Sequence, residues 1–290
     1  MPDELALDKR LVRRSFDQAA KTYDAAAVLQ NEVCGRMLSR LEYIKLSPQT
    51  VLDAGSGTGN ALPALSSRFA EARLVALDIA PAMLGVARKR FPWWHTIVGR
   101  KSVSAVCGDV EALPLASESV DLVWSNLALQ WVSALPVAFA EMHRALRPGG
   151  LLMFSSFGPD TLKELRDATT GADSYTHVNR FVDMHDIGDM LVESRFADPV
   201  IDMEMLTLTY DRVRDLMHDL KAIGAHNVTR GRRAALGGRR ALERVEARYE
   251  THRREGKLPA TFEVVYGHAW KPQPRTGPSG PAEAAPRSGS

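Results

Sequence analysis

The heptapeptide Asp53-Ala54-Gly55-Ser56-Gly57-Thr58-Gly59 is the most informative part of the chain. It follows the apolar run Thr50-Val51-Leu52 and precedes a segment with helical spacing, residues 61–69. Glycines in such a loop let the backbone approach a ligand closely, and the first turn of the helix offers free amide groups. Strand, loop and helix together predict a ligand-binding site in an α/β protein.

The spacing of the glycines differs from that of a dinucleotide-binding loop, which has the pattern G-x-G-x-x-G. Here the third glycine, Gly59, comes one residue early, and Asn60 follows it. A carboxylate at Asp53, two residues before Gly55, would repel a pyrophosphate but suits a ligand with a cationic amino group. We therefore expect a cofactor of the second kind at this loop.

Short apolar runs alternate with helical segments along the chain. The expected strands are residues 50–52, 74–77, 104–107, 120–124 and 151–155, with two more at 200–208 and 260–266. The expected helices are residues 61–69, 81–90 and 135–146, the last ended by Pro148-Gly149-Gly150. This alternation predicts a parallel sheet with helices on both faces.

Polar side chains stand at the carboxyl ends of four expected strands: Asp53, Asp78, Asp109 and Asn126. Ligands of parallel sheets bind beyond these ends. Asp78 can accept hydrogen bonds from both hydroxyls of a ribose, although an aspartate shortly before Pro81 is also a common helix cap. Asp109 can accept from an adenine amino group while Val110 packs on the ring, or it can be a turn aspartate.

From Val51 through Leu152 the chain resembles the class I S-adenosylmethionine-dependent methyltransferase family. The matching motifs are the glycine loop, the acidic end of the second strand, Gly108-Asp109 with Leu113-Pro114, Asp121-Leu122-Val123 and Leu146-Arg147-Pro148-Gly149-Gly150. The resemblance implies a seven-stranded, doubly wound α/β sheet and S-adenosyl-L-methionine as cofactor. It implies that the cofactor is bound by Asp53, Gly55, Gly57, Gly59, Asp78, Ile79, Met83, Asp109, Val110 and Asn126. Ser56 departs from the cysteine of many members, but binding through the backbone needs neither side chain.

A narrower resemblance extends beyond this core. It rests on Phe16-Asp17-Gln18-Ala19-Ala20-x-x-Tyr23, Trp124-Ser125-Asn126-Leu127-Ala128-Leu129-Gln130-Trp131, Asn179-Arg180-Phe181 and Leu220-Lys221-x-Ile223-Gly224-Ala225. These segments are similar to the malonyl-[acyl-carrier protein] O-methyltransferase family of biotin synthesis. The resemblance implies methylation of the free carboxylate of a malonyl thioester on an acyl carrier protein.

Such a reaction needs no general base, because a malonyl carboxylate is already ionised at neutral pH. It needs a cation or donor that orients the carboxylate, and Arg180 and Lys221 are the candidates because they lie in the narrower motifs. Either residue can instead be an ordinary surface charge. Tyr23 can hydrogen-bond in the closed site or simply pack there.

Two other functions also fit the sequence. Leu258-Pro259-Ala260-Thr261-Phe262 and Phe157-Gly158-Pro159-Asp160-Thr161-Leu162 also resemble methyltransferase-like arginine hydroxylases that serve the assembly of respiratory complex I. A non-catalytic protein with a structural cofactor is the third hypothesis. Asn179-Arg180-Phe181 and the Lys221 segment favour the carrier-protein enzyme.

The chain is expected to have three parts: an N-terminal helical segment at 1–46, a methyltransferase domain at 47–270, and a disordered tail at 271–290, which is rich in proline. Two segments, near 170–195 and 210–256, are expected to form a helical lid over the site. Residues 230–254 contain nine arginines and three glutamates. This segment is either a solvated helix face or a docking site for an acidic carrier protein.

Composition restricts the remaining function classes. A net charge of +2 is too small to indicate binding to nucleic acid or to a membrane. Cys34 and Cys107 are too few for a disulfide framework or a metal cage, so no metal is expected. Residues 1–10 lack the apolar core of a secretory signal, and no run approaches the roughly 18 apolar residues of a membrane span. We therefore expect a cytoplasmic protein.

Overall fold

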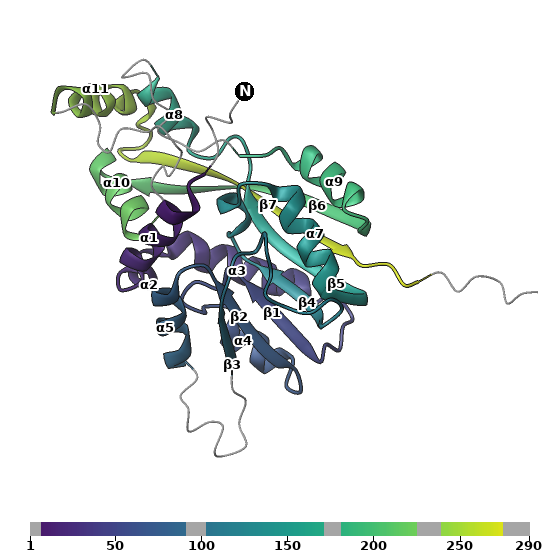
Figure 1. The fold of residues 1–290 in the computed structure, drawn as a ribbon. Helices are drawn as coiled ribbons and strands as arrows, with labels where there is room; N and C mark the ends of the chain where they lie inside the picture. The colour runs from purple at the N-terminus through teal and green to yellow at the C-terminus, as the bar shows by residue number, and fades with distance from the viewer. Residues whose placement is uncertain (1–6, 91–102, 171–180, 225–238, 275–290) are drawn as a thin grey trace, which may run out of the picture.

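A seven-stranded sheet forms the centre of the protein in the computed structural model (Figure 1). The structure describes residues 7–90, 103–170, 181–224 and 239–274. The strands are β1 (Thr50–Ala54), β2 (Arg73–Asp78), β3 (Val103–Cys107), β4 (Val120–Ser125), β5 (Leu146–Phe157), β6 (Ala197–Tyr210) and β7 (Leu258–Trp270). They lie in the order β3-β2-β1-β4-β5-β7-β6. All seven expected strands are confirmed, each with longer bounds.

Helices flank this sheet, and α8, α10 and α11 lie together at one end of the molecule (Figure 1). They are α1 (Lys9–Ala19), α2 (Tyr23–Ala26), α3 (Val28–Leu41), α4 (Leu62–Arg68), α5 (Pro81–Arg90), α7 (Leu135–Ala145), α8 (Lys163–Thr169), α9 (Met184–Glu193), α10 (Val213–Ala222) and α11 (Arg239–Tyr249). Two short 3-10 turns, η1 (Leu129–Trp131) and η2 (Glu250–His252), complete the described set. The three helices expected from spacing are confirmed as α4, α5 and α7.

The direction of β7 corrects the expectation of a parallel sheet. Strands β1 to β5 pair in parallel, but β7 runs antiparallel to both β5 and β6. The cause is the connection between β6 and β7. Tyr210 at the end of β6 pairs with Leu258 at the start of β7, so the chain leaves and re-enters the sheet at the same end. Helices α10 and α11 lie in that connection, where a hairpin would have a short turn.

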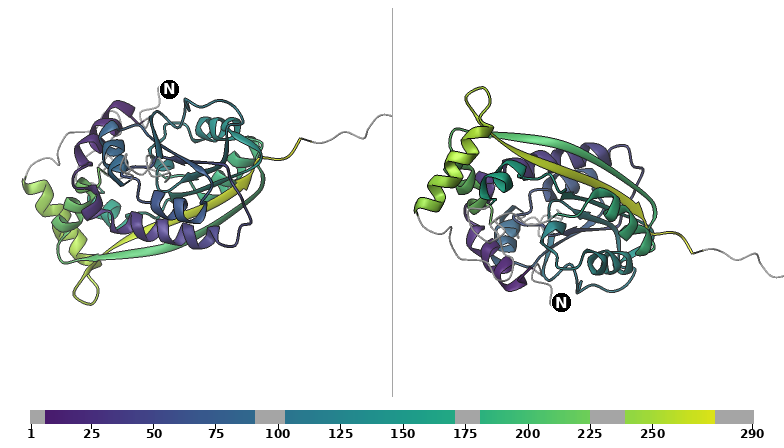
Figure 2. Two further views of the ribbon diagram at one scale, coloured as in Figure 1. Left: turned by 90° about the horizontal axis from the view of Figure 1, so that it is seen from below. Right: turned by 90° about the horizontal axis from the view of Figure 1, so that it is seen from above.

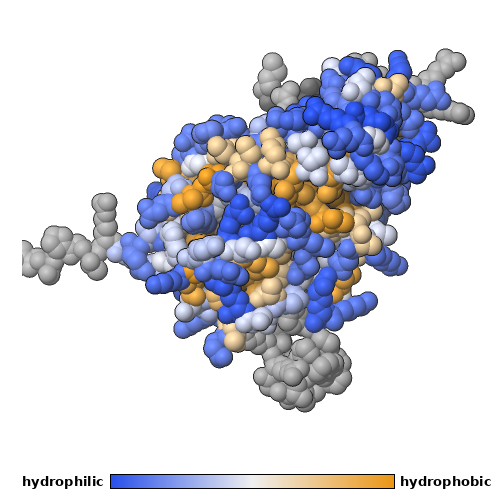
Figure 3. All heavy atoms as spheres, turned by 180° about the vertical axis from the view of Figure 1, so that it is seen from behind, coloured by the Kyte–Doolittle hydropathy of each residue, from blue (hydrophilic) through white to orange (hydrophobic). Residues whose placement is uncertain are grey.

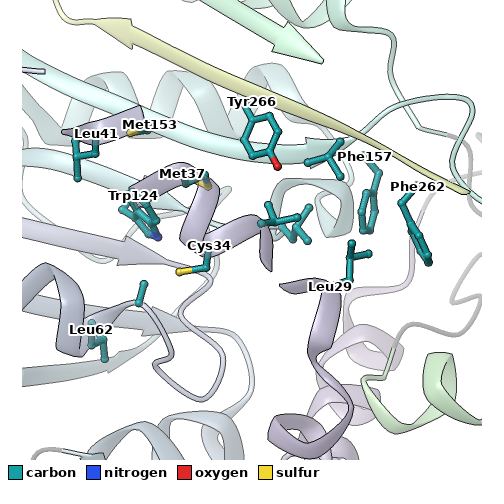
Figure 4. Close-up of a cluster of buried hydrophobic side chains, with 14 of the residues drawn as sticks. Leu29, Cys34, Met37, Leu41, Leu62, Trp124, Met153, Phe157, Phe262 and Tyr266 are labelled. Atoms are coloured by element: carbon teal, nitrogen blue, oxygen red, sulfur yellow. The ribbon is translucent and has the colours of Figure 1, made fainter. Parts of the chain in front are cut away.

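The core has two layers because successive strand residues face opposite sides of the sheet. Val51 of β1 belongs to a cluster with residues of α3 and α4, and its neighbour Leu52 to a cluster with residues of α7 and α9. Figure 2 shows α3 and the α7–α9 pair on opposite sides of the sheet. In the first cluster, Met37 and Leu41 of α3 lie near Trp124 and Met153 of the sheet (Figure 4). Helix α3 is therefore part of the core, although it belongs to the expected N-terminal segment.

The boundary of the expected tail also needs correction. The amide of Gly149 donates to the carbonyl of Lys271, and the amide of Lys271 donates to the carbonyl of Gly150, at 2.8 and 2.9 Å. Lys271 therefore continues the pairing of β7 with β5 and does not begin a tail. The same pairing keeps Pro148-Gly149-Gly150 in the extended start of β5, directly after helix α7 ends. Residues 275–290 of the predicted tail lie outside the described residues.

Part of the expected lid covers the sheet instead. Ile187 and Leu191 of α9 are buried in the core, and α9 packs against α7 and β6. The polar residues of 170–195 indicate a lid, but the apolar residues Ile187 and Leu191 of α9 pack on the sheet. Helices α10 and α11 occupy the second expected lid segment, and α11 packs against α8.

None of the described helices is both long and apolar enough to cross a bilayer.

Candidate functional site

A pocket opens at the carboxyl ends of β1, β2 and β4, and α1 and α2 form its opposite wall. It is lined by Lys9, Val12, Phe16, Tyr23, Gly55, Gly57, Leu77, Asp78, Ile79, Met83, Gly108, Asp109, Val110, Asn126, Leu127, Ala128, Trp131 and Val132. This is the edge of the sheet at which the sequence predicts ligand binding.

The glycine loop forms the floor of the pocket. Gly57 has a φ of +53°, and a Cβ atom at this position would meet no protein atom within 4 Å. Since Gly57 also lines the pocket, the space beyond its Cα is open to a ligand. At Gly55 a Cβ atom would instead lie 2.3 Å from the Cβ of Ala128, so this glycine permits close contact between the loop and the chain after β4.

Asp78, at the end of β2, connects the loop to the start of α5. Its Oδ2 accepts a hydrogen bond from the amide of Gly57 at 2.8 Å, and its Oδ1 accepts one from the amide of Ala80 at 2.8 Å. Burial raises the pKa of Asp78 to about 6, against the opposing effect of these two hydrogen bonds. Asp78 therefore stabilises the turn into α5, as a capping residue would, and it also lines the pocket; its role toward a ribose stays a prediction.

Asp53 lies directly behind the pocket wall. It is 2% exposed, and its Oδ2 has no hydrogen-bond partner among the described residues. Burial, with a contribution from Asp78, raises the pKa of Asp53 to about 8. An isolated buried carboxylate is costly unless a cation or donor pairs with it. Asp53 therefore supports a ligand that brings positive charge.

Asp109, at the end of β3, meets the N-terminal helix. The Lys9 ammonium of α1 forms ion pairs with Asp109 and Glu111. Burial disfavours this ammonium, but the hydrogen bonds to the two carboxylates outweigh that effect and raise the pKa of Lys9. Glu111 also accepts from the amides of Ser133 and Ala134 at the start of α7. Helix α1 is thereby fixed across one end of the pocket.

Aromatic side chains enclose the pocket beneath α1 and α2. The rings of Phe16 and Trp131 meet edge to face, with centroids 5.3 Å apart. Tyr23 comes from α2. Its pKa is raised above the usual range by burial and, to a smaller extent, by the carboxylates of Asp78 and Asp24. The Tyr23 hydroxyl therefore stays protonated at neutral pH and is a hydrogen-bond donor.

Asn126 is held in a defined orientation at the end of β4. Its Nδ2 donates to the carbonyl of Gln30 at 3.1 Å, and its Oδ1 accepts from the Ser155 hydroxyl at 3.0 Å. The same hydroxyl accepts from the amide of Leu127, which has a φ of +47°. The chain after β4 is thus fixed where it forms the pocket wall.

The pocket fits S-adenosylmethionine better than a dinucleotide. Two carboxylates line it, Asp53 behind it can ionise when a cation binds, and Lys9 is the single cation among the lining residues. A sulfonium and an ammonium group gain from this charge, whereas a pyrophosphate would be repelled. The strand-end carboxylates Asp78 and Asp109 both line the pocket, so each can act as a hydrogen-bond acceptor for a bound ligand. Nowhere in the described parts of the chain do three or more His, Cys, Asp or Glu side chains gather in a way that could hold a metal ion.

Most residues predicted from the sequence meet in this pocket. The lining includes Tyr23, Gly55, Gly57, Asp78, Ile79, Met83, Asp109, Val110 and Asn126. Asp53 and Gly59 are not in the lining; a Cβ atom at Gly59 would lie 2.9 Å from that of Ala87, so this glycine serves packing of the loop on α5. Lys221 is exposed on the last turn of α10, outside the lining. Arg180 lies outside the described residues.

The wall formed by α1 is the part that sequence reasoning missed. Lys9, Val12 and Phe16 follow one another at spacings of three and four residues, so they lie on one face of a helix. This periodicity was a usable signal for a helix but did not identify what the face covers. Trp131 and Val132 were missed for the same reason.

Comparisons with known proteins agree with this geometry. A family model described as "Methyltransferase domain" matches residues 52–154. A malonyl-[acyl-carrier protein] O-methyltransferase of Gallionella capsiferriformans is 58% identical, over 97% of this chain and 97% of the relative. The enzyme of the same name from Nitrosospira multiformis is 59% identical, over 93% and 91%. Among solved structures, phosphoethanolamine N-methyltransferase 2 of Haemonchus contortus, in complex with S-adenosylhomocysteine, superposes with a TM-score of 0.57 at 17% identity. That match covers 90% of this chain and 60% of the other.

Proposed function

Because the chain belongs to the malonyl-[acyl-carrier protein] O-methyltransferase family, we propose that it methylates the free carboxylate of a malonyl thioester carried by an acyl carrier protein, in biotin synthesis. S-adenosylmethionine is the methyl donor. The observation that carries the proposal is identity of 58% across 97% of both chains. It extends far beyond residues 52–154, the part common to methyltransferases in general. A cytoplasmic location, expected from the sequence, belongs to the same proposal.

The chemistry asks little of acid–base groups. Bound S-adenosylmethionine supplies an electrophilic methyl group on a sulfonium. The acceptor carboxylate is ionised at neutral pH, so it needs no general base. The protein must then hold the two reactants in line and keep water away from the carboxylate oxygen. Phe16 and Trp131 provide apolar cover for the pocket, and the protonated Tyr23 provides a donor.

We propose further that a basic residue orients the acceptor carboxylate. Lys221 and Arg180 remain our candidates. Lys221 stands on α10 next to Ala222, whose carbonyl accepts a hydrogen bond from Thr22 at 3.0 Å. Since Tyr23 follows Thr22 directly, this bond brings the chain next to Lys221 near the pocket wall in the fold, while the Lys221 side chain is exposed. An exposed cation at this place suits a carboxylate that arrives from outside on a carrier protein.

Docking of the carrier protein is proposed for the end of the molecule formed by α10 and α11. This end is strongly hydrophilic (upper right in Figure 3). Arg244, Arg248 and Arg254 are exposed there. Ion pairs reduce the local excess of positive charge: Arg214 pairs with Glu246 at 2.5 Å, and Arg253 pairs with Glu250 at 2.7 Å. The structure therefore favours a docking role for the arginines outside these pairs over one for the whole basic segment.

The two other hypotheses are not favoured. The relatives with 58% and 59% identity carry the name of an O-methyltransferase, and neither is named a hydroxylase or an assembly factor.

Two carrier-bound substrates test the function. With malonyl-carrier protein, the enzyme should convert S-adenosylmethionine to its demethylated product. With acetyl-carrier protein, which has the same thioester but no free carboxylate, it should not. Turnover with both substrates, or with neither, would contradict methylation of the malonyl carboxylate.

A further inference from the structure

Tyr23 reaches the pocket from a helix that cannot hold its own position. Helix α2 has four residues, and no side chain caps its start. A helix of this length is unstable alone, since the cost of nucleation exceeds the gain from so few hydrogen bonds. The placement of Tyr23 must therefore come from contacts that α2 makes with the rest of the protein.

Asp24, the next residue of α2, makes such contacts. Its Oδ1 accepts a hydrogen bond from the Thr58 hydroxyl at 2.5 Å, and its Oδ2 accepts one from the Arg90 guanidinium at 2.9 Å. Arg90 also donates through Nε to the carbonyl of Thr58 at 2.8 Å. Asp24, Thr58 and Arg90 thus form a closed triangle between α2, the glycine loop and the end of α5.

The triangle is built into the floor of the site. Thr58 is 1% exposed and lies between Gly57 and Gly59. The carboxylate of Asp24 is about half exposed, at 51%, and Asp24 does not line the pocket. Its influence on a bound molecule must therefore pass through the residues that it holds. The two bonds to the charged Asp24 carboxylate therefore hold α2 in addition to the neutral bond between Thr22 and Ala222.

We propose that Asp24 is a positioning residue that ties α2 to the glycine loop through Thr58 and Arg90, and so sets the Tyr23 side chain against Asp78 and the bound cofactor. The inference rests on the proposed function in one respect: S-adenosylmethionine is taken as the ligand of the pocket. Tyr23 packs against the small cluster of Ala19, Ala20, Ala80 and Met83 and, like Asp24, is outside the two main core clusters, so loss of the Asp24 charge should loosen α2 and leave the sheet intact.

Hydrogen exchange and calorimetry test the role of Asp24. Asp24→Asn should speed amide exchange across residues 20–27 in the ligand-free protein and weaken the affinity for S-adenosylmethionine by about tenfold or more. The matched control is Asp211→Asn, which breaks an exposed ion pair with Lys257 that is remote from the pocket lining. It should change neither quantity.

A double-mutant cycle separates positioning from a general loss of structure. If Asp24 acts through Tyr23, then Asp24→Asn should cost much less affinity in a Tyr23→Phe background than in the unmodified protein. Additive losses, or exchange and affinity equal to those of Asp211→Asn, would overturn the inference. Failure of the unmodified protein to bind S-adenosylmethionine would contradict the proposed function, and the exchange measurement would still decide whether Asp24 holds α2.

Discussion

Cofactor binding should release a proton from Asp53. Without ligand, the pKa of Asp53 is about 8, raised by burial and by Asp78, and that of Asp78 is about 6. At pH 7 Asp53 is then about 90% protonated and Asp78 about 90% ionised. A ligand with a sulfonium and an ammonium group favours the ionised form of both. Binding at pH 7 should therefore release up to about one proton per cofactor, about 0.9 of it from Asp53 and about 0.1 from Asp78.

The affinity should change with pH in the matching direction. The complex binds fewer protons than the free protein. The dissociation constant should therefore fall by up to about tenfold for each unit by which the pH rises between 6 and 7.5. The ligand-free protein should show the opposite trend in stability. Its folded state binds the Asp53 proton more tightly than the unfolded chain does, so this group lowers the free energy of unfolding as pH rises between about 4 and 8.

Calorimetric titration in two buffers with different ionisation enthalpies measures the released protons directly. Asp53→Asn should remove most of the proton release and most of the pH dependence, whereas Asp211→Asn should retain both. A proton count near zero in the unmodified protein would refute the reasoning, as would an Asp53→Asn variant that releases as many protons as the unmodified protein.

Three further predictions concern single contacts. Gly57→Ala should greatly weaken cofactor binding, but it should cost only about 1–2 kcal/mol of stability, because Gly57 has a left-handed φ. The control is Gly256→Ala, outside the pocket, where φ is +77° and the surroundings are equally open. It should show the stability loss alone. Asp78→Asn should lose one charge-assisted hydrogen bond, about 1.5–3 kcal/mol of binding; normal affinity with a lower melting temperature would make Asp78 only a helix cap. Combined replacement of Arg244, Arg248 and Arg254 by alanine should raise KM for malonyl-carrier protein and reduce its salt dependence, without affecting a short malonyl thioester. The matched replacement of Lys45, Arg73 and Lys89 should leave both substrates unaffected, and equal effects of the two triple variants would exclude docking on α11.

Local sequence patterns predict much of the fold and the floor of the site. The strands, the glycine loop and the strand-end residues Asp78, Asp109 and Asn126 are set by short-range periodicity and by loop chemistry. Parallel strands then bring these residues to one edge of the sheet, so a ligand-binding edge is predictable from spacing, whereas the identity of the ligand is implied by the family resemblance.

The rest depends on contacts between distant segments. Nothing in the period of residues 260–266 specifies the direction of β7, which follows from where the chain returns after α11. The helical face of Lys9, Val12 and Phe16 does not show what it covers, because Asp109 is 100 residues from Lys9 and Trp131 is 115 residues from Phe16. The prediction of a lid at α9 was wrong for the same reason. Ile187 and Leu191 of this helix pack in one cluster with strand residues that are distant in the sequence, such as Leu52 and Val265.

The position of the transferred methyl group tests the central claim most directly. The unmodified protein would be incubated with malonyl-carrier protein and S-adenosylmethionine labelled with ¹³C in the methyl group, and the product examined by ¹³C NMR and mass spectrometry. We predict a single labelled methyl ester on the distal carboxylate oxygen of the malonyl group, formed together with one equivalent of S-adenosylhomocysteine. Label on carbon, label on the carrier polypeptide, or unchanged malonyl-carrier protein would contradict the account.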